Sequence, residues 1–134
     1  MNGEYKEQLP FGVGDLIVTK EKYYIQFYFS GPDLRYNGTL IRIEKNEIDE
    51  YIVAFQKNWE KYLELDAMRS ILGNSFSTVG LLKMDIRVGD LFNGVFISSY
   101  HLPLRSEFDI KSIVESLCWA KSKGPEIMNR LFTL

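Results

Sequence analysis

The sequence predicts an α+β fold with a single antiparallel sheet of about five strands and two main helices packed on one of its faces. Three observations favour this class: strand patterns occur in two hairpin-like groups, a helical pattern separates the groups, and a second helical pattern follows them. The expected order of elements is βββαββα. Because the 134 residues contain no repeat or linker, we expect one domain, residues 1–134, with a flexible N-terminal lead at residues 1–14.

Three strands are expected in the first part of the chain. Residues 16–19 and 23–29 are rich in aromatic and β-branched side chains and flank the charged residues 20–22, a pattern typical of a β-hairpin. Turn residues follow at 30–33. Apolar and charged residues then alternate over residues 39–44, which predicts the third strand.

The first helix is predicted from a change of period. Apolar residues recur at intervals of three and four from Ile48 to Leu63, with Asn46 as the expected N-cap. Asp66 would fall in the centre of the apolar stripe, so we expect this helix to end before it. A short second helical segment is expected to follow and to end at Gly73.

Two more strands, at residues 82–88 and 95–100, are expected to form a second hairpin, because alternation returns around an Asn-Gly turn. Ser106 and Asp109 have the spacing of a capping box, which predicts the start of the last helix. Cys118 lies on the apolar stripe of that helix and is expected to be a small buried side chain. The Gly124-Pro125 pair is expected to break or kink the helix.

Composition argues against several classes of protein. Sixteen basic against eighteen acidic residues give a net charge of −2, which argues against a nucleic-acid partner. A lone cysteine forms no internal disulfide, and the N-terminus lacks the pattern of a signal peptide. No apolar run approaches the roughly 20 residues that cross a bilayer. We therefore expect a cytoplasmic protein without a membrane partner.

No catalytic, metal or cofactor signature is recognisable. His101 is the only histidine, and no cysteine or histidine spacing typical of a metal site occurs. Gly12 and Gly14 precede a strand and do not form a phosphate cradle. We therefore expect no cofactor, no metal and no enzymatic activity. The alternative is a small enzyme that uses His101 as its acid or base, whereas an ordinary loop histidine would serve neither role.

A candidate interaction surface comes from the sheet face opposite the helices. Strand alternation directs a set of aromatic and arginine side chains to that face. Tyrosine and arginine dominate the energetic centres of protein interfaces. The alternative is that these residues stabilise a solvated sheet or pack beneath the N-terminal lead. The candidate residues are Tyr24, Tyr28, Arg42, Arg87, Phe96 and Tyr100.

Four carboxylates form a second candidate feature, Glu44, Glu47, Asp49 and Glu50. Acidic residues are favourable at the start of a helix, which explains them without a function. The alternative is that they present phosphate-like charge to a basic partner, such as a nuclease.

The segments Tyr24–Pro32, Glu47–Val53 and Gly94–Pro103, in a small and mildly acidic chain, resemble the immunity proteins that accompany bacterial polymorphic and contact-dependent growth-inhibition toxins. This resemblance implies a cytoplasmic inhibitor that binds and neutralises one cognate toxin domain, and it assigns no individual residue. The free protein is expected to be a monomer or a weak dimer. A self-associating regulatory or structural subunit, burying Tyr24, Tyr28 and Tyr100 against a second copy, is the further alternative.

Overall fold

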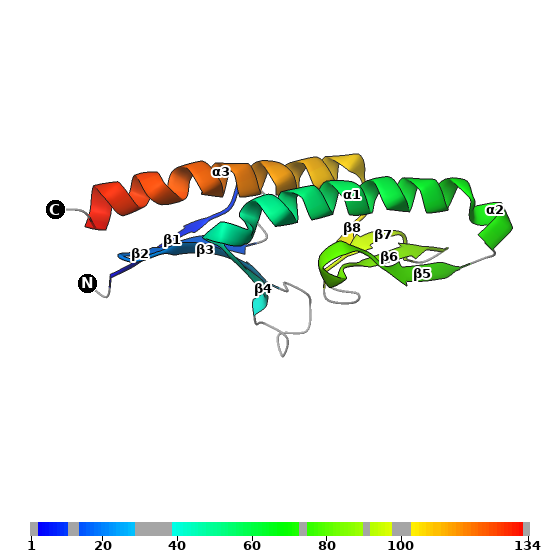
Figure 1. The fold of residues 1–134 in the computed structure, drawn as a ribbon, viewed down its shortest axis with the longest axis horizontal. Coiled ribbons are helices and arrows are strands. Elements are labelled where there is room, and N and C mark those ends of the chain that lie inside the picture. Colours follow the sequence, from blue (N-terminus) through cyan, green and yellow to red (C-terminus); the bar gives the residue numbers. More distant parts are fainter. Residues whose placement is uncertain are drawn as a thin grey trace. The chain divides into compact units, whose positions relative to one another are not determined.

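The computed structural model describes residues 3–10, 14–28, 39–72, 75–89, 92–97 and 103–132, with the side chains of residues 39, 40 and 72 excepted. In these residues the chain forms two antiparallel sheets of four strands each, together with helices (Figure 1). The α+β class is confirmed, but the expectation of a single five-stranded sheet is wrong. Three strands that the sequence pattern did not predict, β1, β5 and β8, complete the two sheets.

The strands of the first sheet are β1 (Glu4–Gln8), β2 (Gly14–Thr19), β3 (Tyr23–Tyr28) and β4 (Thr39–Glu44). Those of the second are β5 (Phe76–Val79), β6 (Asp85–Val88), β7 (Gly94–Phe96) and β8 (Pro103–Leu104). The helices are α1 (Ile48–Ala67), α2 (Arg69–Leu72) and α3 (Glu107–Phe132), with short 3-10 turns η2 (Lys45–Glu47) and η3 (Leu81–Lys83). In both sheets the strand order follows the sequence order.

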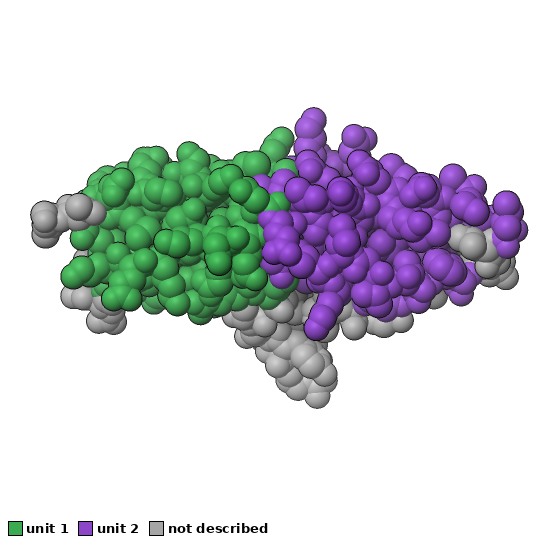
Figure 2. Space-filling view, in the orientation of Figure 1, with its two compact units in different colours: residues 1–49, 112–134 green, residues 50–111 purple. Residues whose placement is uncertain are grey.

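The chain divides into two compact units (Figure 2). Unit 1 comprises residues 1–49 and 112–134 and contains the sheet β1–β4 with most of α3. Unit 2 comprises residues 50–111 and contains the sheet β5–β8 with most of α1. The boundaries between the units fall inside α1 and α3, so neither is marked by the loop composition that sequence analysis uses to find a domain boundary.

In unit 1, the predicted β2–β3 hairpin is confirmed. The Thr19 side chain accepts hydrogen bonds from the backbone N–H groups of Glu21 and Lys22, which closes the turn. The resulting register places Leu16 opposite Ile25, and Ile25 opposite Ile43, and all three are fully buried. They form the core on the sheet face that carries Tyr23.

α3 lies along this same face of the sheet β1–β4 (Figure 1). A methyl group added at Gly124 of α3 would lie 2.5 Å from two ring atoms of Tyr23, so only glycine permits this approach. Of the break or kink expected at Gly124-Pro125, the break does not occur, because α3 continues to Phe132. Pro125 is exposed, so water can bond the backbone carbonyl that loses its helical partner.

The predicted start of α3 is confirmed, since the Ser106 hydroxyl accepts a hydrogen bond from the backbone N–H of Asp109 over 3.1 Å. The expected N-cap of α1 is wrong. Asn46 lies inside η2, and the Glu47 carboxylate instead accepts the backbone N–H of Glu44, one residue before that turn. α1 also continues past Asp66, where we expected it to end, and α2 follows as the predicted short segment.

In unit 2, α1 is joined to η3 through Asn58, which is only 2% exposed. Its side-chain oxygen accepts the backbone N–H of Leu81 over 2.8 Å, and its nitrogen donates to the Leu81 carbonyl over 3.1 Å. Leu82 and Lys83, the next two residues, have φ of 53° and 59°, in the left-handed region that side chains other than glycine seldom adopt. The hydrogen bonds of Asn58 thus fix a turn whose backbone is locally strained.

Candidate functional site

The best-formed candidate site is the outer face of the sheet β1–β4, opposite the face that carries Tyr23. Alternation along β3 places Tyr24, Gln26 and Tyr28 on this outer face. The register adds Arg42 of β4 directly opposite Gln26, and Glu44 directly opposite Tyr24. Three of the predicted interface residues and one predicted carboxylate therefore share one sheet face.

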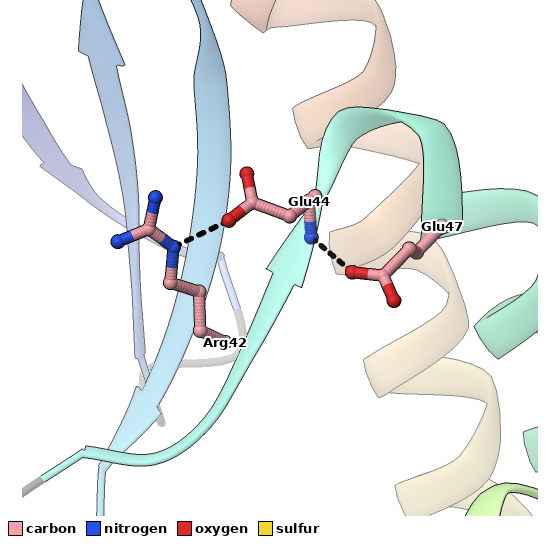
Figure 3. Close-up of polar contacts among 3 residues, drawn as sticks. All are labelled: Arg42, Glu44 and Glu47. Atoms are coloured by element: carbon pink, nitrogen blue, oxygen red, sulfur yellow. Dashed lines mark hydrogen bonds and ion pairs between the residues drawn. The ribbon is translucent and has the colours of Figure 1, made fainter.

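Arg42 is held in place on this face by two neighbours. Its guanidinium carbon lies 3.7 Å from the centroid of the Tyr24 ring, a cation–π stack. Its Nε atom donates to Oε1 of Glu44 over 2.6 Å, as Figure 3 shows. Because the Tyr24 ring and the Glu44 carboxylate already hold the Arg42 side chain, it loses little conformational entropy when a partner binds it.

The stack also corrects the expected role of Tyr24. The sequence pattern placed this ring on the outer face, yet Tyr24 is only 8% exposed. Arg42 covers it, and the Lys22 ammonium group lies 5.6 Å from the ring centroid. A partner approaching this face would therefore meet the guanidinium of Arg42 more than the ring of Tyr24.

Tyr28 is half-buried, and its hydroxyl donates to Oε1 of Gln26 over 2.7 Å. Burial raises the pKa of the Tyr28 phenol, and the nearby Asp15 carboxylate raises it further. The hydroxyl thus stays protonated through the neutral range as a polar end on an aromatic body. Sequence analysis did not single out Lys22 or Asp15, although the hairpin register alone brings Asp15 opposite Gln26.

The four candidate carboxylates differ in what they already contact. Glu44 pairs with Arg42, and Glu47 accepts the backbone N–H of Glu44 over 3.0 Å (Figure 3). Asp49 accepts from the Lys121 ammonium group over 2.6 Å, and this contact raises the pKa of Lys121. Glu50 is exposed on α1. Three of the four carboxylates therefore already bind groups of this chain.

The remaining candidates belong to the other sheet. Phe96 lies on the expected face, opposite Asp85 and away from Ile86, but it is fully buried. Arg87 lies 6.0 Å from the centroid of its ring, and Phe92 packs against its edge at 6.4 Å between centroids. The expectation that Phe96 adds exposed aromatic surface is wrong. Tyr100 lies outside the described residues, as does His101, on which the enzyme alternative depends.

Two further expectations concern single residues and metals. Cys118 is exposed on α3, so the expectation of a buried thiol is wrong. In the described part of the chain, no group of three or more His, Cys, Asp or Glu side chains could hold a metal ion. None of the helices seen in those residues has both the length and the apolar character to span a membrane.

Comparisons with known proteins identify no relative of this chain. No family model matches the chain, and no curated protein and no solved structure is significantly similar to it. The fold and the site geometry described above are therefore the basis for a functional proposal.

Proposed function

We propose that the protein is a non-enzymatic, cytoplasmic inhibitor that binds and neutralises a cognate toxin domain, and that the outer face of the sheet β1–β4 is its binding surface. The observation that carries this proposal is the fixed geometry of Arg42, stacked on Tyr24 and paired with Glu44. The resemblance of the sequence to bacterial immunity proteins supplies the class of partner.

The chemistry of the face supports a protein partner. Arginine and tyrosine are enriched among the residues that dominate binding energy, because each combines a large contact area with a polar end. Arg42 is exposed and held in place, and Tyr28 adds a half-buried ring with a neutral hydroxyl. A carboxylate of the toxin opposite Arg42 would complete a bidentate pair with the guanidinium atoms that Glu44 leaves available.

The test uses the C-terminal domain of the large secreted protein expected from the adjacent upstream reading frame. Wild-type protein should bind this domain and protect cells that express it. Arg42→Ala should weaken binding by about 30-fold, the effect of losing about 2 kcal/mol at an interface centre. Tyr28→Ala combined with Arg42→Ala should weaken binding further. The stability of Arg42→Ala should fall by no more than about 1 kcal/mol, since the stack and the ion pair are both near the surface.

Arg130→Ala is the matched control, because Arg130 is exposed on α3 and its loss changes the net charge equally. Equal binding by the Arg42→Ala and Arg130→Ala variants would show that the surface is misassigned. If wild-type protein neither binds the domain nor protects cells, or if no such reading frame exists, the inhibitor function itself is refuted.

A further inference from the structure

The edges of the two sheets differ in how they are protected against pairing with another chain. An edge strand exposes unpaired backbone groups, and proteins guard such edges with charges, proline or very short strands. β1 carries Glu4, Lys6 and Glu7, and β4 carries Arg42 and Glu44. β8 has only two residues and begins with Pro103. Three of the four edge strands therefore have a feature that disfavours pairing with another chain.

The fourth edge strand, β5, carries no such guard. Its residues, Phe76 to Val79, are uncharged, and three of the four, Phe76, Thr78 and Val79, are of types enriched in strands. They lie within the segment from Ser70 to Leu82, which contains no charged residue. β5 pairs with β6 on one side, and among the described residues no strand pairs with its other side. Val79, at the end of this open edge, is 67% exposed.

The open edge is also held rigid at its C-terminal end. Gly80 follows Val79 directly, and a methyl group added there would lie 2.5 Å from Oδ1 of Asn58. The backbone N–H of Gly80 donates to the Met84 carbonyl over 2.6 Å, and Asn58 bonds both backbone groups of Leu81. A strand whose end is fixed in this way loses little entropy when a second strand pairs with it.

We propose that β5 pairs antiparallel with β5 of a second copy of this chain, forming a weak, symmetric dimer. An uncharged strand suits self-pairing, because a twofold axis places identical residues near one another and no like charges meet. This inference uses a different sheet from the proposed toxin-binding face and does not depend on the inhibitor function.

The register of this pairing follows from the side-chain alternation. Residues directly opposite one another in an antiparallel pair lie on the same face of the sheet. A twofold axis at Ser77 satisfies this condition and places Phe76 opposite Thr78 of the second copy, a favourable pair of an aromatic and a β-branched side chain. Because each strand contributes only four residues, the association should be weak and concentration-dependent.

The test is sedimentation velocity of the full chain over a concentration series up to about 1 mM, the range in which weak dimers form. Ser77→Asp places two like charges together at the twofold axis and should raise the dimer dissociation constant by about tenfold or more. The Ser77→Asp variant remains compatible with the fold, because Arg87 lies opposite this position on β6. Gln56→Glu adds the same charge at an exposed site on α1 and should leave the association unchanged.

Mixing separately prepared Ser77→Asp and Ser77→Lys variants should restore association, because opposite charges then meet at the axis. If Ser77→Lys fails to fold beside Arg87, Val79→Lys, which lies opposite Asp85, provides a second charged edge that should dissociate the dimer. Wild-type protein that stays monomeric throughout overturns the proposal. So does a Ser77→Asp variant that associates like Gln56→Glu, and unrestored mixtures of folded variants overturn the twofold register. Loss of toxin binding by Ser77→Asp in a monomeric protein would instead assign the edge to a strand of the toxin.

Discussion

Replacing Asn58 by alanine tests whether this buried amide holds the strained turn after β5. The side chain is 2% exposed and makes three contacts, with the N–H and the carbonyl of Leu81 and with Sδ of Met84 at 3.2 Å. Alanine removes all three. It leaves the Leu81 N–H without its partner, beside the left-handed residues Leu82 and Lys83, whereas the Leu81 carbonyl keeps the hydrogen bond from the backbone N–H of Met84.

The expected loss follows from these contacts. Each hydrogen bond to Leu81 contributes about 1 kcal/mol net, and a backbone group left unpaired in a partly buried place adds about 1 kcal/mol more. The total is about 3 kcal/mol, which corresponds to a decrease of about 10 °C in the thermal midpoint for a chain of this size. Gln56→Ala, at an exposed position of the same helix, should change the stability by less than about 0.5 kcal/mol.

Urea unfolding measures the loss in the free energy of unfolding. Amide hydrogen exchange reports on the turn directly, because the Leu81 N–H should lose its protection against exchange in the Asn58→Ala variant.

A second variant, Asn58→Asp, tests the hydrogen bond to the Leu81 carbonyl. At neutral pH its carboxylate repels the Leu81 carbonyl, whereas in acid the protonated form can donate to that oxygen. The stability of this variant should therefore rise relative to wild type as the pH falls. Unchanged protection of Leu81 together with a loss below about 0.5 kcal/mol would refute the reasoning.

Three further predictions concern glycine positions and pH. Gly124→Ala should lower the free energy of unfolding by about 1 to 3 kcal/mol despite alanine's better helix propensity, because the new methyl group overlaps the Tyr23 ring. Urea unfolding of this variant with and without Tyr23→Ala should show strong coupling, and additive losses would contradict the contact. Lys83→Gly should raise the free energy of unfolding by up to about 1 kcal/mol, since φ of 59° suits glycine; a loss measured by urea unfolding would show that the turn is unstrained. Burial raises the pKa values of Tyr23 and Tyr62, so their contribution to stability is complete below about pH 10 and declines as the pH rises through the folded-state pKa values. Alkaline unfolding should thus be shallower in Tyr23→Phe, and an identical pH profile would contradict this assignment.

The elements with a strong local pattern were predictable, and those without one were not. The helix from Ile48 followed from the spacing of its apolar residues, and residues 23–28 followed from their aromatic and β-branched composition. β1 was missed because Glu4, Lys6 and Glu7 hide the alternation expected of a strand. β8 has only two residues, too few for any period to appear. Pro125 does not end α3, because it lies on an exposed side of the helix, where a lost hydrogen bond costs least. The sequence alone does not show this exposure.

The sheet face on which each candidate side chain lies was predictable, but the neighbouring side chains that cover it were not. Alternation correctly directed Tyr24 and Arg42 to one side of the first sheet, and Phe96 away from Ile86 in the second. A period of two says which face a side chain joins, but not which neighbour folds over it. The long side chain of Arg42 covers Tyr24, and Arg87 and Phe92 cover part of Phe96. At Tyr24 and Phe96 the exposed aromatic surface is consequently smaller than the alternation predicted.

The number of sheets changes the functional argument more than any single residue does. The five predicted strands correspond to β2, β3, β4, β6 and β7, and without β1, β5 and β8 they suggested one continuous sheet. On one sheet, Arg42 and Arg87 would have belonged to a single surface with the tyrosines. Arg42 and Arg87 instead belong to two different sheets, so strand pairing places only Arg42, Tyr28 and their neighbours on one sheet face. The same division creates four strand edges in place of two, and the unguarded β5 is one of them.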